Sequence, residues 1–398
     1  MNRPCALSPE LALLAACDLA SDRRLSAMLD DAAARNIDWR RFGDLAEGNG
    51  MAGLAMARLS QAAPASVPAP LQERFAGVER AGALAHMLQG RTSVRLSRDL
   101  AKAGIRSIVL KGQALSHMLY RPYPHWRTSS DIDLLIPSGA LAGADRLLRD
   151  EGFVRQWPEQ DLPEHGGDMI LLLANVFEYV CQESGQLVEL HHRITLNPHW
   201  LPGDFEALDR TASEVETGQG AVRGLDGPML VAYLCWHAFA HYNFRLKWVS
   251  DIVRALRHTG FASCAQACPP EAGFAQGPVE LADALLAAVL PAIDDREASV
   301  TKGVWRRQIG RIVAGMEDPR RFPTRRSLAS LPAEAAFRAF LARLSPGLRG
   351  KGYELIRGLC DPRDVATLGL GARYAPLYAV AGPLLALKRF AVRQATAA

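Results

Sequence analysis

The apolar residues of this chain change their spacing at Gly104, and that change limits the folds it can adopt. From Ser8 to about Lys102, Leu and Ala recur every three or four residues, which predicts helices. Ile105 to Leu110 then form a short run rich in β-branched residues, which predicts a buried strand. We therefore expect a fold that combines helices with a sheet.

The sheet-forming part of the chain lies between 105 and 191. Strand patterns are found at 105–110, 131–136, 176–182 and 186–191. Helical spacing follows the first two of these strands, over 113–120 and 139–151. A Glu-Ser-Gly turn separates the last two strands and predicts an antiparallel hairpin.

Beyond Pro198 the spacing is helical again, most clearly over 228–259, with Gly- and Pro-rich loops near 260–278 and 317–332. The sequence therefore predicts an α+β fold in which a mixed-sheet core is flanked by helical domains. We expect a helical N-terminal domain at 1–100, the core at 101–195 and a helical C-terminal domain at 196–398.

The composition is typical of a packed globular protein, with 398 residues of which 49% are hydrophobic and 22% charged. The seven cysteines are irregularly spaced, which favours reduced thiols in a cytoplasm over a disulfide framework. Leu14 to Cys17 imitates a lipoprotein cleavage site, but Glu10 interrupts the apolar run, so we expect a buried helix turn there. The longest apolar stretch, near 374–387, contains two prolines, and no transmembrane span is expected.

Positive charge is concentrated in the C-terminal quarter of the chain. The net charge is +4, yet residues 301–398 hold 18 Lys or Arg against 6 Asp or Glu. The arginines of this basic tail include Arg306, Arg307, Arg311, Arg320, Arg321, Arg325 and Arg326. Two interpretations are open: these arginines form a surface for nucleic acid or an anionic membrane, or they pair with acids of the first 300 residues.

Three acids occur within otherwise apolar strands. Asp131 and Asp133 alternate along one strand, so their side chains leave the same face of the sheet. Two carboxylates on one face repel each other unless a cation lies between them. Glu189 is the single acid of Leu187 to Leu190, and if its strand lies near Asp133 the three carboxylates can bind divalent metal ions. A solvated strand end is the alternative for the Asp-x-Asp pair alone.

Lys111 and Gly112 lie between a buried strand and a helix. A helix N-terminus presents backbone N–H groups to phosphate, glycine permits a close approach, and lysine adds a cation. This pair alone is weak evidence, and it gains meaning from its position 19 residues before Asp131.

Together these residues resemble the nucleotidyltransferase superfamily, in which a glycine-containing turn and helix precede an Asp-x-Asp strand and a later strand carries a third acid. The chain is most similar to the uncharacterised bacterial nucleotidyltransferase family, which has Lys-Gly at that turn. The segments that carry the resemblance are Val109-Leu110-Lys111-Gly112, Tyr120-Arg121-Pro122, Arg127, Ser130 to Ile136, Val188 to His191, and a helical segment with His237, His241, Trp248 and Asp251. The close resemblance spans roughly 90–260.

The resemblance implies a nucleotidyltransferase core that uses ATP or another NTP with a divalent metal, and we expect two Mg²⁺ ions. Asp131, Asp133 and Glu189 would be the catalytic and metal-binding residues. The nucleotide-binding residues would be Lys111, Gly112, Arg127, Ser130 and Lys247.

Several of these side chains have simpler alternatives. Arg127 neutralises the carboxylates, binds phosphate, or lies in a surface loop. His191 shares a face with Glu189, and it either supports the metal site or simply ends a strand. His237 and His241 lie one helical turn apart, where packed polar residues are favoured over metal ligands. We expect Lys247 to reach a nucleotide and Asp251 to cap a helix or pair with an arginine.

The function predicted from these residues is transfer of a nucleoside monophosphate from an NTP to a hydroxyl-bearing acceptor, with release of pyrophosphate. The acceptor is a small molecule, a sugar, a peptide or an RNA, and the sequence does not distinguish among them. The alternative is a non-catalytic interaction protein that keeps the core as a scaffold and binds nucleic acid or an anionic surface through its basic tail.

Overall fold

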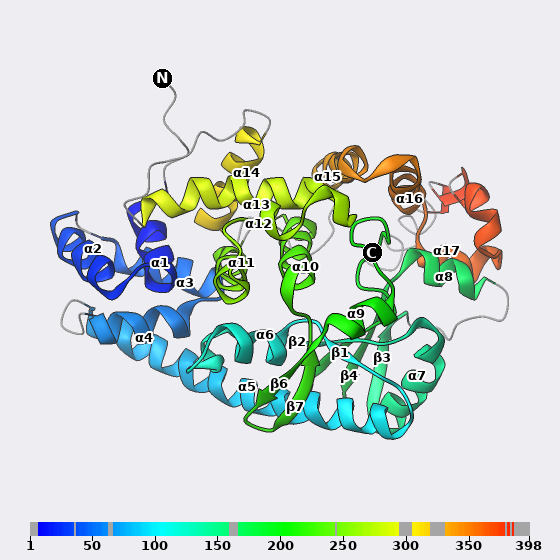
Figure 1. The fold of residues 1–398 in the computed structure, drawn as a ribbon, viewed down its shortest axis with the longest axis horizontal. Helices are drawn as coiled ribbons and strands as arrows, with labels where there is room; N and C mark the ends of the chain where they lie inside the picture. The colour runs from blue at the N-terminus through cyan, green and yellow to red at the C-terminus, as the bar shows by residue number, and fades with distance from the viewer. Residues whose placement is uncertain are drawn as a thin grey trace, which may run out of the picture. The chain divides into compact units, whose positions relative to one another are not determined.

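The computed structural model describes residues 7–35, 37–62, 67–158, 166–242, 245–293, 305–318 and 331–385, apart from 379 and 383. These residues form helices and a mixed sheet (Figure 1), which confirms the predicted α+β class. The chain divides into two compact units, each assembled from segments distant in sequence. Unit 1 comprises Met1–Arg98, Ile108–Ile132 and Leu208–Arg325; unit 2 comprises Asp99–Ser107, Asp133–Ala207 and Arg326–Ala398. The domain boundaries expected at 100 and 195 stay a prediction.

Seven strands make up the sheet, in the order β3-β4-β5-β2-β1-β7-β6. Their bounds are β1 Ile108–Val109, β2 Asp131–Leu135, β3 Phe153–Trp157, β4 Val176–Cys181, β5 Leu187–His191, β6 Ser213–Thr217 and β7 Gly220–Gly224. β3, β4 and β5 are antiparallel neighbours, and β1 runs parallel to β7. The four strands expected from the sequence are therefore present, including the hairpin formed by β4 and β5.

Unit 1 is mainly helical. Its helices are α1 Pro9–Leu19, α2 Asp22–Arg35, α3 Trp39–Gly48, α4 Ala52–Ala62, α5 Ala69–Lys102 (which ends in unit 2), α6 Gly112–Leu119, α10 Gly227–Ala240, α11 Leu246–Thr259, α12 Cys264–Ala267, α13 Gln276–Val289 and α14 Arg306–Glu317. Ser8 caps α1, because its Oγ accepts a hydrogen bond from the Leu11 N–H at 3.2 Å. Cys17 is fully buried in α1, as expected of a buried helix turn.

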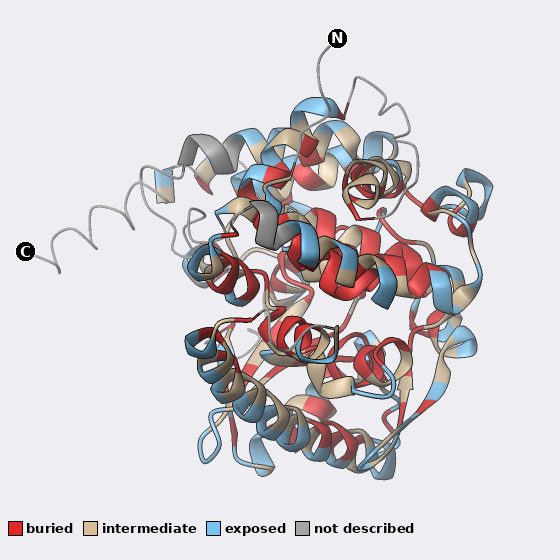
Figure 2. Cartoon of the chain, turned by 90° about the vertical axis from the view of Figure 1, so that its left-hand side faces the viewer, coloured by how far each residue is buried: buried red, intermediate tan, exposed pale blue. Residues whose placement is uncertain are grey.

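Unit 2 combines the β3-β4-β5 arm with several helices, of which α7 packs against β3. These helices are α7 Leu141–Asp150, α8 Gly167–Leu173, α15 Leu331–Leu344, α16 Gly347–Leu359 and α17 Pro362–Leu368, and α9 Phe205–Thr211 begins in this unit. One apolar cluster joins α8 to the C-terminal segment through Met169, Leu173, Val365 and Tyr378. Figure 2 shows the buried residues in red along the inward faces of the elements.

The structure differs from the sequence prediction mainly at weakly apolar segments. β6 and β7 occur in a stretch expected to be helical. The alternating strand pattern is weak there, because Val215 and Val222 are the main buried apolar side chains of the two strands. The helical stretch over 228–259 is two helices, α10 and α11. α12 and the start of α13 lie within the predicted loop at 260–278, because the Ser263 hydroxyl caps α12.

Three of the seven basic-tail arginines, Arg306, Arg307 and Arg311, are exposed on α14, and the other four lie outside the described residues. Among the described residues, no helix is both long and apolar enough to cross a membrane. The six described cysteines are free thiols.

Candidate functional site

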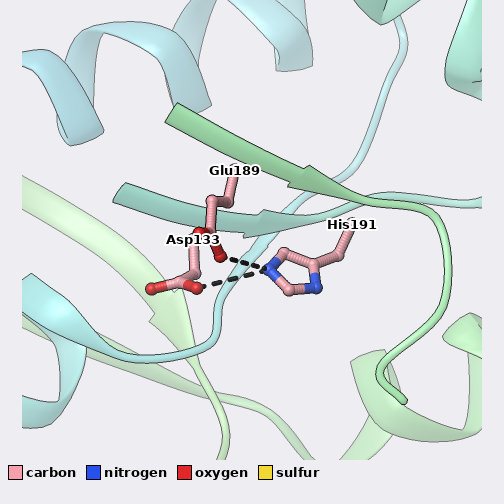
Figure 3. A group of neighbouring side chains, drawn as sticks. All are labelled: Asp133, Glu189 and His191. Carbon is pink, nitrogen blue, oxygen red and sulfur yellow. Dashed lines mark hydrogen bonds and ion pairs between the residues drawn. The ribbon is translucent and has the colours of Figure 1, made fainter. Parts of the chain in front are cut away.

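Two acids and a histidine meet on one face of unit 2. Asp133 comes from β2, and Glu189 and His191 come from β5, where alternate residues share a face. His191 Nε2 lies 3.2 Å from Asp133 Oδ1 and 3.5 Å from Glu189 Oε2. Figure 3 shows the three side chains pointing toward one another. One ligand atom from each lies within 4.8 Å of the others, so the group can hold a metal ion.

The surroundings of this group fit a cation. Asp133 is fully buried, and Glu189 keeps 24% of its side chain exposed, so the group has a buried end and a solvent-facing end. Burial acts to lower the pKa of His191, but the hydrogen bonds and charges of Asp133 and Glu189 outweigh it and raise that pKa. The two carboxylates therefore already stabilise a positive charge at the place where they converge.

A fourth acid, Glu178, lies beside the group. It is paired directly with Glu189 across β4 and β5, so the two carboxylates face the same side of the hairpin. Burial and the charge of Glu189 raise the pKa of Glu178. The sequence did not single out Glu178, although the alternating pattern of its strand placed it on one face with Val176 and Val180.

Asp131 belongs to unit 1 and is not a member of the candidate metal-binding group of Asp133, Glu189 and His191. Its carboxylate accepts a hydrogen bond from Ser129 Oγ at 2.9 Å. Ser130, expected at the nucleotide, is exposed. Strand alternation puts Asp131 on the same side of β2 as Asp133, and its metal-binding role stays a prediction.

Lys111 and Gly112 form the turn between β1 and α6, as the sequence predicts, and Gly112 is the first residue of the helix. Gly112 has a φ of +53°, a left-handed conformation that favours glycine, and a Cβ there would lie 3.6 Å from the Asp131 carbonyl oxygen. Lys111, the residue before the helix, is buried with 8% exposure. The strand-to-helix turn is thus close to the backbone that leads into the Asp-x-Asp strand.

Unit 1 gathers several cations around this turn. Burial and the nearby charge of Arg127 lower the pKa of Lys247, the second residue of α11, to about 8. Burial and the charge of Lys111 lower the pKa of His237 well below its usual value. Gly50 leaves room for the Lys247 side chain, since a Cβ there would lie 3.0 Å from Lys247 Cδ. We call Lys111, Arg127 and Lys247 the basic cluster.

Arg127 is held in place by a buried carboxylate. Its Nε and Nη2 donate to Asp251 Oδ1 and Oδ2 at 2.8 and 2.9 Å, and both side chains are at most 5% exposed. Tyr120 Oη donates to the same carboxylate at 2.8 Å. The Nη1 of Arg127 is also buried, and among the described residues it has no hydrogen-bond partner. Arg127 therefore does not lie in a surface loop.

This support extends to Arg254 of α11. Its guanidinium lies over the Tyr120 ring, 4.3 Å from the centroid, and it forms an ion pair with buried Asp18 of α1. No local pattern in the sequence indicated these contacts, because the partners of Tyr120 and Arg254 are more than 100 residues away in the chain.

His237 and His241 pack with an aromatic ring rather than forming a metal site with a third ligand. The centroids of the His237 and His241 rings lie 4.6 Å apart, and each is within 5.6 Å of the Trp248 ring. Among the described residues, the only group of three or more potential metal ligands is the one around Asp133. This arrangement agrees with the packed-helix interpretation of the two histidines.

Comparison with known proteins gives one match. The model of a family described as uncharacterised nucleotidyltransferase matches residues 35–266. No curated protein and no solved structure matched the chain. The matched region includes the basic cluster, the Asp-x-Asp strand, and the hairpin with Glu189 and His191. Because the match covers more than half of the chain, this protein belongs to that nucleotidyltransferase family.

Proposed function

We propose that this protein transfers a nucleoside monophosphate from an NTP, such as ATP, to a hydroxyl-bearing acceptor and releases pyrophosphate. The observation that carries the proposal is the Asp133, Glu189 and His191 group, which provides a metal-binding constellation within a nucleotidyltransferase family. The free, largely buried thiols support a cytoplasmic location. The acceptor class stays open among small molecules, sugars, peptides and RNA.

The acidic residues have distinct proposed roles. Asp133, together with Asp131 of the same strand, is proposed to bind two divalent metal ions, for which the family resemblance by itself implies Mg²⁺. Bound metal would neutralise charge on the phosphates. Glu189 is proposed to complete one metal site and to accept the proton from the acceptor hydroxyl, because its partly exposed carboxylate can be reached from solvent.

The basic cluster is proposed to hold the triphosphate, with Gly112 offering the helix N-terminus and Ser130 adding a hydroxyl. Two observations support this role. Nη1 of Arg127 is a buried donor with no partner among the described residues. Burial and the charge of Arg127 lower the pKa of Lys247, so a phosphate beside these two cations would be stabilised. In-line attack by the acceptor oxygen on the α-phosphorus then forms the new P–O bond as the bond to pyrophosphate breaks.

The first experiment measures ligand-dependent thermal stability of the full chain. An NTP with Mg²⁺ should raise the melting temperature, and the Asp131→Asn/Asp133→Asn variant should lose that rise. Lys111→Ala should weaken NTP binding by roughly 1–3 kcal/mol, the value of one charge-assisted contact, and leave the fold intact. A rise that persists in the double variant would favour the non-catalytic scaffold.

The second experiment identifies the reaction. The protein, each NTP in turn, a divalent metal and pools of candidate acceptors are incubated together, and mass spectrometry searches for an acceptor that has gained a nucleotidyl group. Wild type should produce this increment and the Asp133→Asn variant should not. Pyrophosphate formed without any modified acceptor would indicate NTP hydrolysis and contradict the proposed transfer.

A further inference from the structure

We propose that His191 is a nitrogen ligand of the divalent metal and that it makes the site favour Mn²⁺ over Mg²⁺. This inference rests on the proposed function, because it concerns the same metal. It adds a ligand of a different chemical class to the carboxylates and predicts which cation the site prefers. On the sequence alone, His191 is equally compatible with a role that supports the metal site and with a simple strand end.

The separations within the group match those between ligands of one ion. His191 Nε2 lies 3.2 and 3.5 Å from the nearest oxygens of Asp133 and Glu189. Ligands about 2.1 Å from a metal are roughly 3.0 Å apart in octahedral and 3.4 Å apart in tetrahedral geometry. Two of the three separations are therefore nearly those of a coordination sphere, and the carboxylate oxygens of Asp133 and Glu189 lie within 4.8 Å of each other.

The neighbouring histidine shows what a purely structural imidazole looks like at this strand end. His192 Nε2 bonds to the Ala174 carbonyl oxygen at 2.8 Å, and its ring lies edge-to-face with Phe177. His191 instead directs Nε2 at two carboxylates, and its buried Nδ1 has no hydrogen-bond partner among the described residues. Its interactions are therefore concentrated on the nitrogen that faces the acids.

The donor set bears on the identity of the ion. Mg²⁺ takes oxygen ligands almost exclusively, whereas the divalent ions of the first transition series, from Mn²⁺ onward, also accept an imidazole nitrogen. Two carboxylates with one imidazole therefore suit Mn²⁺ better than Mg²⁺. Glu178, paired with Glu189, adds negative charge beside the group and strengthens the attraction for either cation without distinguishing between them.

The test uses the full-length protein and the metal alone. Mn²⁺ is titrated without nucleotide, and the loss of its free-ion EPR signal gives the affinity; Mg²⁺ affinity follows from competition. The key variant is His191→Gln, which keeps a polar side chain able to donate to a carboxylate but lacks the imidazole nitrogen. We expect Mn²⁺ affinity to fall about tenfold or more and Mg²⁺ affinity to change by less than about threefold.

His192→Asn is the matched control, because it removes the adjacent imidazole and leaves Nε2 of His191 in place. It should keep wild-type Mn²⁺ affinity. Circular dichroism melts of both variants verify that each is folded before metal binding is compared.

Spectroscopy of the bound ion provides a readout that a merely structural role would not change. Electron spin-echo envelope modulation of bound Mn²⁺ should show coupling to ¹⁴N, and this coupling should become ¹⁵N coupling when the histidines carry ¹⁵N. The coupling should be absent in His191→Gln and present in His192→Asn.

Two results would overturn the inference while leaving nucleotidyl transfer intact: bound Mn²⁺ without nitrogen coupling, or equal losses of Mn²⁺ and Mg²⁺ affinity in His191→Gln. A wild-type protein that binds neither ion, with or without NTP, would overturn the inference together with the proposed function.

Discussion

The acidic group of unit 2 and the basic cluster of unit 1 are assembled in different ways. Asp133, Glu189 and His191 come from two strands, and alternation along each strand fixes the face that they share. Lys111, Arg127 and Lys247 come instead from a helix start, a loop and a second helix. Regular backbone geometry thus positions the acids, whereas packing and ion pairs position the cations.

We therefore expect a single substitution to have its largest effect, a loss of transfer activity, in the acidic group. Asp133→Asn keeps the size of the buried side chain and removes one charge that we propose to bind the metal. Because a metal supplies several kcal/mol of charge stabilisation, transfer activity should fall by about a thousandfold or more. Product formation measured by mass spectrometry checks this expectation. Glu183→Gln, an exposed acid in the turn of the same hairpin, is the control and should keep wild-type activity.

The next largest effect should come from the support of the basic cluster. Asp251→Asn leaves the buried Arg127 guanidinium without its carboxylate, and breaking a buried ion pair costs about 3–5 kcal/mol of unfolding free energy. Urea unfolding measures this loss. The control is Asp22→Asn, because Asp22 pairs with Arg58 but is 82% exposed, and its removal should cost about 0–1 kcal/mol. Equal losses in the two variants would mean that Arg127 is not held as the structure indicates.

The same contrast explains how much the sequence could predict. The Asp-x-Asp strand and the hairpin were predictable, because period-two alternation and a turn signal are local features. That Glu189 faces Asp133 depends on strand order, which the sequence suggested only through the family resemblance. The pairing of Arg127 with Asp251 spans 124 residues and left no local pattern, so Asp251 could be described only as a residue that caps or pairs with an arginine.

The basic cluster should make NTP affinity depend on pH. In the free protein the pKa of Lys247 is lowered to about 8, so the lysine loses its charge as the pH rises through that value. NTP affinity should therefore decrease between pH 7 and 9, because a neutral amine attracts phosphate weakly. Lys247→Ala should bind NTP about 1–3 kcal/mol more weakly at pH 7 and show a flatter pH dependence, as measured by isothermal titration calorimetry.

The control for this prediction is Lys102→Ala, because Lys102 is an exposed lysine paired with Asp99. It should change neither the affinity nor its pH dependence. A wild-type affinity that stays constant from pH 7 to 9 would contradict a phosphate contact by Lys247.

The smallest effect concerns His86 of α5, at the edge of the positive field around the basic cluster. Its ring stacks on His117 at a centroid distance of 5.2 Å. Burial, then the charges of His117, His125 and Arg127, lower its pKa to about 4. Between pH 6.5 and 4, His86 therefore binds a proton in the unfolded chain but not in the folded chain. The free energy of unfolding falls as the pH is lowered through this window.

Urea unfolding of wild type and His86→Gln at pH 7 and pH 5 tests this linkage. The variant should lose less stability between the two pH values, because glutamine does not titrate, while the remaining dependence comes from the other histidines whose pKa is lowered. His199→Gln, at an exposed position, should behave as wild type does. An unchanged pH dependence in His86→Gln would show that burial and the neighbouring charges do not lower the pKa of His86, and would contradict this linkage.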